Sequence, residues 1–256
     1  MERVINLSSK MIGFDRQLKK EWLDLVIEML HDGETRDKIT EALNKYIGND
    51  LKGKDAIRKT RLVINRMWFN PNFQLEFLRR SALELFNEAR TENATSIIHW
   101  GMCIACYPYF RDIARICGRL INLQGYFKPS QVRQRTMEIW GERPVVRRSV
   151  DRVIQTIMYW GLIEQENASD KYVVSKFVRI NNPKLVNWLI RAYLVSRESK
   201  TASIDDLRND PVLFPFSINI NIDNLLLNKE IELFNQGLKS EILILRTIDH
   251  TSDEAN

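Results

Sequence analysis

Positively charged side chains gather in one stretch near the middle of this 256-residue chain, residues 128–152. The stretch holds seven cations and three carboxylates, an excess of four positive charges, while the whole chain carries +5. The cations are Lys128, Arg133, Arg135, Arg143, Arg147, Arg148 and Arg152. Arginine guanidinium groups bind phosphates and guanine edges through paired hydrogen bonds. The distribution of charge therefore favours a polyanion as partner.

The second half of this stretch has the spacing of an amphipathic helix. At about 100° per residue, Val146, Val150, Val153, Ile157 and Trp160 share one side, and Arg147, Arg148, Asp151, Arg152 and Gln155 share the other. A helix that packs its apolar side on its own domain and offers guanidinium groups outward suits the major groove of DNA. We predict Arg147 and Arg148 as the main contacts, with Arg152 and Gln155 beside them.

A protein-docking face is the alternative, because any surface helix shows charges opposite an apolar stripe. Winged domains serve more than one function, so the fold type alone does not select DNA. Asp151, in the middle of the charged face, would repel phosphate unless it reads a cytosine amino group or pairs with Arg147 or Arg148. The prediction of DNA contact therefore depends on how Asp151 is used.

The elements around the basic helix predict a winged helix-turn-helix. Residues 110–125 and 129–141 have helical patterns, and residues 162–176 predict two short strands around a polar turn. Three helices followed by a hairpin is the order of that motif, in which the hairpin forms the wing. Lys171 and Lys176 flank the predicted wing, where basic residues can reach the DNA backbone or minor groove. Alternatively, they protect an edge strand from pairing with other chains.

A second basic cluster lies in the N-terminal part of the chain, on a predicted helix over residues 54–69. Its members are Lys52, Lys54, Arg58, Lys59, Arg61 and Arg66, with Asp50 and Asp55 among them. If this cluster faces the same way as the basic helix, the protein contacts more than one half-site of duplex and binds with a steep salt dependence. If the two diverge, the N-terminal cluster is a solvated face.

One apolar segment contains a possible zinc ligand set. His99, Cys103 and Cys106 share a helix face, and Cys117 follows in the next helix. Three cysteines and a histidine are a known structural zinc set, but such sites take paired ligands from loops rather than three from one apolar helix. Cysteines that fill a helical core are commoner. We predict that this segment is a buried helix and that the protein needs no metal.

Catalytic and targeting signals are few. The chain has no glycine-rich phosphate loop and no hydrolase or metalloprotease motif, so we predict no enzymatic activity and no cofactor. Three cysteines cannot all pair, and no apolar leader follows Met1, which favours a reducing cytoplasm. The longest apolar run, residues 97–110, is shorter than the roughly 18 residues of a membrane span. We expect no membrane contact.

Taken along the chain, these patterns predict a mainly α-helical protein in three parts. Residues 1–95 form an N-terminal helical bundle, residues 96–180 the winged helix-turn-helix, and residues 181–256 a small C-terminal α/β extension. In the extension, alternating isoleucines predict a strand over 217–222, which either completes a sheet in its own chain or pairs with a partner's edge. The pattern of residues 228–242 predicts a helix, and the segment EILIL, residues 241–245, predicts a strand. Residues 247–256 are predicted to form a disordered tail.

The element order, with the segments KTRLVINRMW and RRSVDRVIQTIMYWGLI, resembles the BrxA proteins of bacterial BREX phage-defence systems. The likeness covers about residues 15–165, and the C-terminal extension goes beyond it. The resemblance implies a small non-enzymatic DNA-binding subunit that works beside larger defence proteins. We therefore predict a non-catalytic protein that binds double-stranded DNA. An adaptor that docks on a partner enzyme, or a transcriptional regulator, is the alternative, and the sequence does not indicate the oligomeric state.

Overall fold

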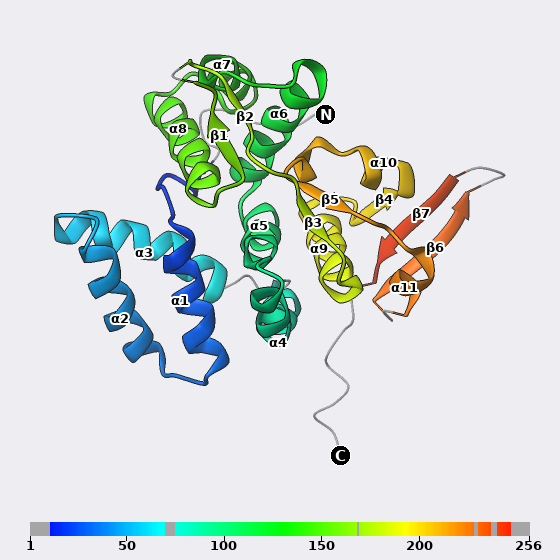
Figure 1. The fold of residues 1–256 in the computed structure, drawn as a ribbon, viewed down its shortest axis with the longest axis horizontal. Coiled ribbons are helices and arrows are strands. Elements are labelled where there is room, and N and C mark those ends of the chain that lie inside the picture. Colours follow the sequence, from blue (N-terminus) through cyan, green and yellow to red (C-terminus); the bar gives the residue numbers. More distant parts are fainter. Residues whose placement is uncertain (1–10, 70–74, 168, 228–229, 237–239, 247–256) are drawn as a thin grey trace, which may run out of the picture.

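The computed structural model describes residues 11–69, 75–167, 169–227, 230–236 and 240–246. The protein is mainly helical with a few short strands, as predicted (Figure 1). None of the helices in these residues is both long and apolar enough to cross a lipid bilayer.

Four helices form the N-terminal part: α1 (Lys20–His31), α2 (Arg36–Gly48), α3 (Lys54–Trp68) and α4 (Glu76–Thr91). Each lies where its apolar periodicity predicts it. The side chain of Thr35 caps α2 by accepting a hydrogen bond from the backbone N–H of Lys38. Helix α1 begins at Lys20 rather than directly after Asp15, because the backbone N–H of Leu18 donates instead to the hydroxyl of Thr156, 2.9 Å away in a distant helix.

Helix α5 (Thr95–Cys106) runs through the centre of the molecule, and residues 95–104 are all buried. It packs against α1, α3 and α4, which precede it in the chain, and against α6 and α9, which follow it. Figure 1 shows it between the N-terminal helices and the rest of the protein. The apolar run that contains His99 is therefore a core helix, as predicted.

The middle part contains the predicted order of three helices and a hairpin: α6 (Pro108–Gln124), α7 (Pro129–Trp140), α8 (Pro144–Tyr159), β1 (Ile163–Gln165) and β2 (Tyr172–Val174). Each helix starts with proline, which suits the first helical position because its missing N–H has no helical partner there. Strands β1 and β2 pair antiparallel. Phe127, between α6 and α7, adds a bridge to Tyr172 through two backbone hydrogen bonds of 2.9 and 2.8 Å.

The C-terminal part mixes short strands and helices: β3 (Val178–Ile180), α9 (Pro183–Ser196), β4 (Thr201–Ser203), α10 (Ile204–Asn209), β5 (Phe216–Ile218), α11 (Ile222–Leu226), β6 (Ile231–Gln236) and β7 (Ser240–Leu245). A 3₁₀ turn, Pro211–Leu213, lies against α6. Strands β4, β7 and β6 form an antiparallel sheet in that order, and β3 pairs with β5 in parallel.

Two predictions for this part are wrong. The strand expected over 217–222 ends at Ile218, because Asn221 caps α11 by accepting a hydrogen bond from the N–H of Asn224 at 3.1 Å. Strand β5 pairs with β3, which completes a sheet within the chain. The helix expected over 228–242 is instead strand β6 and the start of β7, since Leu233 lies opposite Leu243 across the hairpin. The EILIL strand is confirmed in β7. The predicted disordered tail, 247–256, lies outside the described residues.

A single cluster of buried apolar side chains extends from Ile12 to Leu245 through all three predicted parts. The predicted boundary at residue 95 falls at the first residue of α5, which packs on both neighbouring parts. The boundary at 180 falls just before α9, which packs on α4 and α5. The parts are therefore joined by a shared core.

Substitution of Gly101 by alanine tests the contact between α5 and α9. A Cβ at this position would lie 2.3 and 2.6 Å from ring atoms of the buried Trp188. We expect Gly101→Ala to lower the free energy of unfolding by about 1 to 3 kcal/mol, the usual cost of overpacking a core. Chemical denaturation measures it.

Gly48→Ala is the matched control. A Cβ there meets only Ile57, at 3.7 Å, which is an ordinary contact. Alanine should leave the stability unchanged or raise it slightly. Equal stability of the two variants would contradict close packing of α5 on α9.

Candidate nucleic-acid interface

The apolar side of α8 is buried as predicted. Val146, Val150, Val153 and Ile157 have no exposed surface, and Trp160 just after the helix is 5% exposed. Helices α6 and α7 pack against this side. The opposite side carries the arginines that the spacing identified as candidate contacts.

Arg147 and Arg148 project into solvent near the start of α8. Within the part of the chain that the structure describes, neither guanidinium group makes a hydrogen bond or an ion pair. Both groups keep all their donors available. An incoming carboxylate or phosphate can therefore bind them without first displacing a protein partner.

Asp151 pairs with Arg133 of α7, and its carboxylate oxygen lies 2.6 Å from the guanidinium nitrogen. The sequence left open a pair with Arg147 or Arg148, and this is not what the structure shows. Asp151 lies on the edge of α8 that faces α7, so the pair joins the two helices. The carboxylate offsets the charge of Arg133 and leaves the two arginines at the start of α8 uncompensated.

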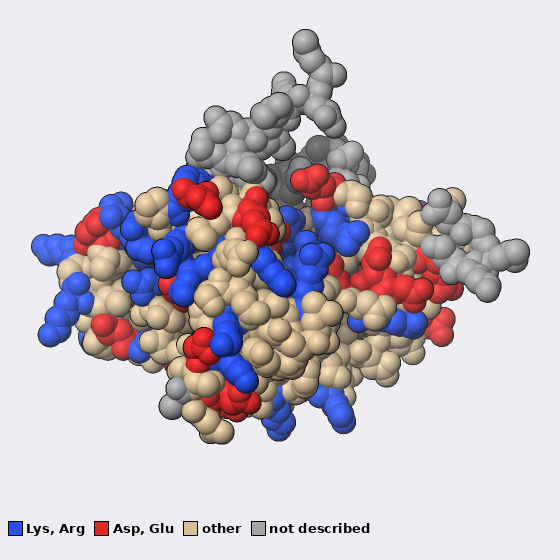
Figure 2. Space-filling view, turned by 90° about the horizontal axis from the view of Figure 1, so that it is seen from above, with Lys and Arg blue, Asp and Glu red and all other residues tan. Residues whose placement is uncertain are grey.

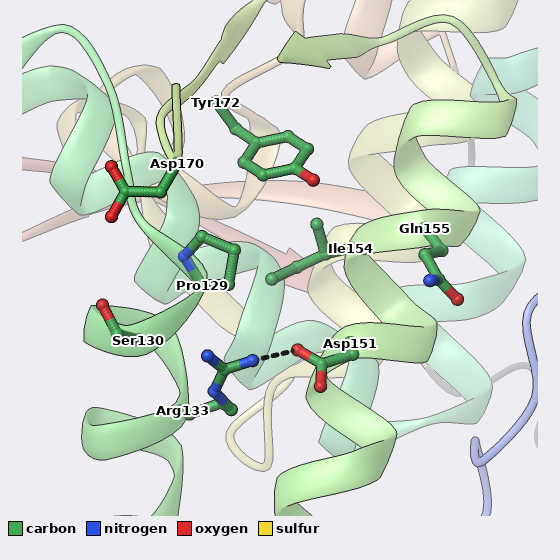
Figure 3. Close-up of a pocket in the computed structure, with 8 residues that line it drawn as sticks. All are labelled: Pro129, Ser130, Arg133, Asp151, Ile154, Gln155, Asp170 and Tyr172. Carbon is green, nitrogen blue, oxygen red and sulfur yellow. Dashed lines mark hydrogen bonds and ion pairs between the residues drawn. The ribbon is translucent and has the colours of Figure 1, made fainter. Parts of the chain in front are cut away.

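A hollow of about 320 Å³ lies beside this ion pair (Figure 3). The start of α7, one face of α8 and the turn end of the hairpin surround it. Its lining residues are Pro129, Ser130, Arg133, Asp151, Ile154, Gln155, Asp170 and Tyr172. In Figure 3 the bond between Arg133 and Asp151 crosses from one helix to the other at the edge of the hollow. Acidic and basic groups are mixed in the lining of this hollow.

Arg152 and Gln155 lie farther along the polar side of α8, and Gln155 also lines the hollow. Arg152 donates hydrogen bonds to the side-chain oxygens of Gln155 and of Gln17, both at 3.2 Å. Gln17 precedes α1 and was not among the predicted site residues. No local pattern could have identified it, because it lies 135 positions from Arg152. Hydrogen bonds within the protein therefore hold the side chains of Arg152 and Gln155 in place.

The other two predicted arginines of this region differ in their surroundings. Arg135 is exposed on α7. Arg143 precedes α8, is half-buried, and donates to the carbonyl of Trp140 at 3.3 Å. Arg135 is therefore available at the surface, whereas Arg143 holds the turn between the two helices.

The two lysines predicted for the wing also differ. Lys171 lies 3.8 Å from Glu166 and 4.4 Å from the ring centre of Tyr126, an aromatic partner that the sequence reading missed. Lys176 follows β2 and is exposed. Among the described residues, its ammonium group has no ion-pair partner. Lys176 is the more accessible cation of this hairpin.

The N-terminal basic cluster is partly neutralised. Asp55 forms ion pairs with Arg58 at 2.7 Å and with Lys59 at 2.6 Å. Arg61 donates to the side chain of Asn44 at 3.0 Å. Lys52 and Lys54, at the start of α3, are exposed, and neither forms an ion pair with any residue that the structure describes. Only part of the predicted cluster is therefore free to bind a partner.

Charge is unevenly distributed over the molecule. Figure 2, which views the protein from above Figure 1, shows Lys and Arg side chains gathering over the half that holds α2, α3, α7 and α8. A dense group of Asp and Glu lies over the half that holds α10 and the hairpin of β6 and β7. Basic and acidic side chains are therefore unevenly distributed over this face.

The possible zinc ligands do not converge. The described residues contain no group of three or more His, Cys, Asp or Glu side chains that could hold a metal ion. Cys103 is buried with its Sγ 3.5 Å from the sulfur of Met67, and Cys117 is buried in α6. Burial raises the pKa of the Cys106 thiol to about 12, and the pKa values of Cys103 and Cys117 are also raised by burial. Burial therefore favours the protonated form of these thiols.

His99 instead pairs with Asp24 of α1, with 2.8 Å between Nε2 and a carboxylate oxygen. Burial lowers the pKa of His99 although the hydrogen bond to Asp24 opposes this. Burial also raises the pKa of Asp24, but hydrogen bonds from His99 and Lys20 outweigh it and lower that pKa to about 2. A neutral His99 that donates from Nε2 to an ionised Asp24 fits both directions. The pair joins α5 to α1.

Comparisons with models of protein families, with curated proteins and with solved structures found no match to this chain.

Acidification should destabilise the protein through His99. Its pKa in the folded state lies below the ordinary value of 6.5, so below that pH the unfolded chain takes up a proton that the native state does not bind. We expect the free energy of unfolding to fall as the pH drops from 7.5 to 5.5, by at most about 1.4 kcal/mol per pH unit from this group. Denaturant titrations at several pH values measure the slope.

His99→Gln should reduce this pH dependence, because glutamine does not titrate. His31→Gln is the matched control, since His31 is exposed at the end of α1. If His99→Gln keeps the slope of the unchanged protein, a neutral buried His99 is the wrong assignment.

Proposed function

We propose that this protein binds double-stranded DNA without catalysing a reaction, and that α8 is its recognition helix. The observation that carries the proposal is the pair Arg147 and Arg148, two exposed guanidinium groups that make no ion pair among the described residues. Guanidinium groups of this kind bind guanine edges and phosphates strongly.

The order of elements around α8 supports this proposal. In a helix-turn-helix, the second helix lies in the major groove and its N-terminal residues reach the base edges. Helices α7 and α8 pack on each other and on α6, and the hairpin of β1 and β2 follows. Arg147 and Arg148 lie in the N-terminal half of α8, where base contacts are expected. This order of elements supports the proposal that this part of the chain is a winged helix-turn-helix.

The remaining cations would position the protein on the duplex rather than read its sequence. Arg135 on α7 and Lys176 at the end of the hairpin are exposed, and they suit contacts with phosphates on either side of the groove. Lys171, Arg152 and Gln155 already have protein partners. Their contribution to binding should be smaller than the sequence suggested.

Work beside phage-defence proteins stays a prediction that rests on the sequence resemblance alone. The cytoplasmic location stays a prediction from the cysteine content and the N-terminal residues. The adaptor alternative placed docking on the strand expected over 217–222 and on the C-terminal unit. Strand β5 pairs with β3 within the chain, so this strand does not favour an adaptor over a DNA-binding protein. We therefore propose DNA as the partner.

The proposal is tested by fluorescence anisotropy with a labelled duplex of random sequence at low and near-physiological salt. We expect binding that weakens steeply as salt rises, because phosphate contacts release counterions. Arg147→Ala combined with Arg148→Ala should weaken binding at least about tenfold, since each contact contributes about 1 to 3 kcal/mol. The melting temperature should not change, because both side chains are exposed.

Arg179→Ala combined with Arg208→Ala is the matched control. These two exposed arginines lie on β3 and α10, away from α8, and their loss should change the affinity much less. No binding at low salt, or equal affinity of the two double variants, would refute α8 as the DNA-contacting helix.

Asp151→Asn gives a test in the opposite direction. It removes a carboxylate one helical turn after Arg147 on α8 and frees Arg133. We expect DNA affinity to rise about two- to fivefold, since a repulsion near the surface is worth up to about 1 kcal/mol. The free energy of unfolding should fall by less than about 1 kcal/mol, because the pair is partly exposed.

Asp205→Asn provides the comparison, because Asp205 is an exposed acid on α10 in the acidic half of the molecule. It changes the net charge equally and should leave the affinity nearly unchanged. Weaker binding of Asp151→Asn would mean that the ion pair with Arg133 is needed to place α8.

A further inference from the structure

We infer that the duplex bound by α8 continues across the start of α3, where Lys52 and Lys54 contact its phosphates. This inference rests on the proposed function and adds a second, separate contact to it. It would make the N-terminal helices part of the DNA-binding surface.

Direct hydrogen bonds fix the N-terminal part to the C-terminal half of α8. The N–H of Leu18 donates to Thr156 Oγ1 at 2.9 Å, and the carbonyl of Leu18 accepts from Trp160 Nε1 at 3.1 Å. All three residues are buried. The segment that leads into α1 therefore has a fixed position relative to the recognition helix.

Lys19 extends this connection to the turn between α2 and α3. Its ammonium group bonds the carboxylate of Asp50 in that turn. The same group lies 5.8 Å from the ring centre of Tyr159, the last residue of α8. The end of α8 and the turn before α3 thus meet at one lysine. Lys52 follows Asp50 by two residues.

Lys52 and Lys54 are the cations of this turn that remain available. Both are exposed, and neither forms an ion pair within the described ranges. Asp50 is occupied by Lys19, and Asp55 is occupied by Arg58 and Lys59. The nearby carboxylates are therefore neutralised by other side chains. Figure 2 shows Lys and Arg side chains, with some Asp and Glu among them, on the half of the molecule in which Figure 1 places α3 and α8.

The two contacts lie at opposite ends of α8. A helix rises about 1.5 Å per residue, so the eleven residues from Arg148 to Tyr159 span about 16 Å. Lys52 and Lys54, which the contacts of Lys19 place near the end of α8, would then meet phosphates away from the part of the groove that receives Arg147 and Arg148.

A series of duplexes from about 8 to about 30 base pairs tests the inference with purified protein. We expect the affinity of the unchanged protein to rise until the duplex covers both contacts. Lys52→Gln combined with Lys54→Gln should bind the shortest duplexes that α8 can hold as well as the unchanged protein does, but gain less with length. On a long duplex, the slope of log K against log salt should become less steep by about 1 for each lysine.

Two comparisons separate this inference from the proposed function. Arg147→Ala with Arg148→Ala should lose affinity at every length, whereas the Arg179 and Arg208 double variant should behave like the unchanged protein. The inference would be overturned if the unchanged protein binds DNA and the lysine variant shows the same dependence on duplex length and on salt. In that case α8 would remain the DNA-contacting helix, without a second contact at α3. No binding by the unchanged protein at any length would overturn the proposed function itself.

Discussion

A helix that must be covered on every side determines how this protein is arranged. Residues 95–104 of α5 are all buried, and an apolar helix of this kind is stable only when neighbours surround it. Helices from the beginning, middle and end of the chain supply those neighbours. Trp188 of α9 packs on Gly101, and Trp100 donates from its indole N–H to the carbonyl of Val212 at 3.1 Å. The parts of the chain therefore share one core.

The position of the basic helix follows from this arrangement. His99 of α5 bonds Asp24 of α1, and its ring lies 5.7 Å from the ring of Trp160 at the end of α8. Trp160 in turn donates to Leu18, just before α1. Because these contacts lie at the C-terminal end of α8, that end is held against the N-terminal part. The N-terminal half of the helix, with Arg147 and Arg148, is left facing solvent.

Ion pairing within the protein decides which charges are left for a partner. Asp151 forms an ion pair with Arg133, and Asp55 forms ion pairs with Arg58 and Lys59. Exposed pairs of this kind contribute little to stability, but they set the pattern of charge that a polyanion meets. Among the described residues, the cations left without an ion-pair partner include those at the start of α8 and at the start of α3.

The amino-acid sequence alone determined the helices of the first 160 residues and the hairpin that follows, because periodicity, proline starts and polar turns act over a few residues. It also determined which side of α8 is buried. Only the tertiary structure decided that residues 231–236 are a strand, since strand pairing needs a partner that local spacing does not show. The same holds for the partners of Asp151 and Arg152. An ion pair or hydrogen bond forms between groups that folding brings together, and Gln17 reaches Arg152 only because a shared core closes the chain across 135 residues.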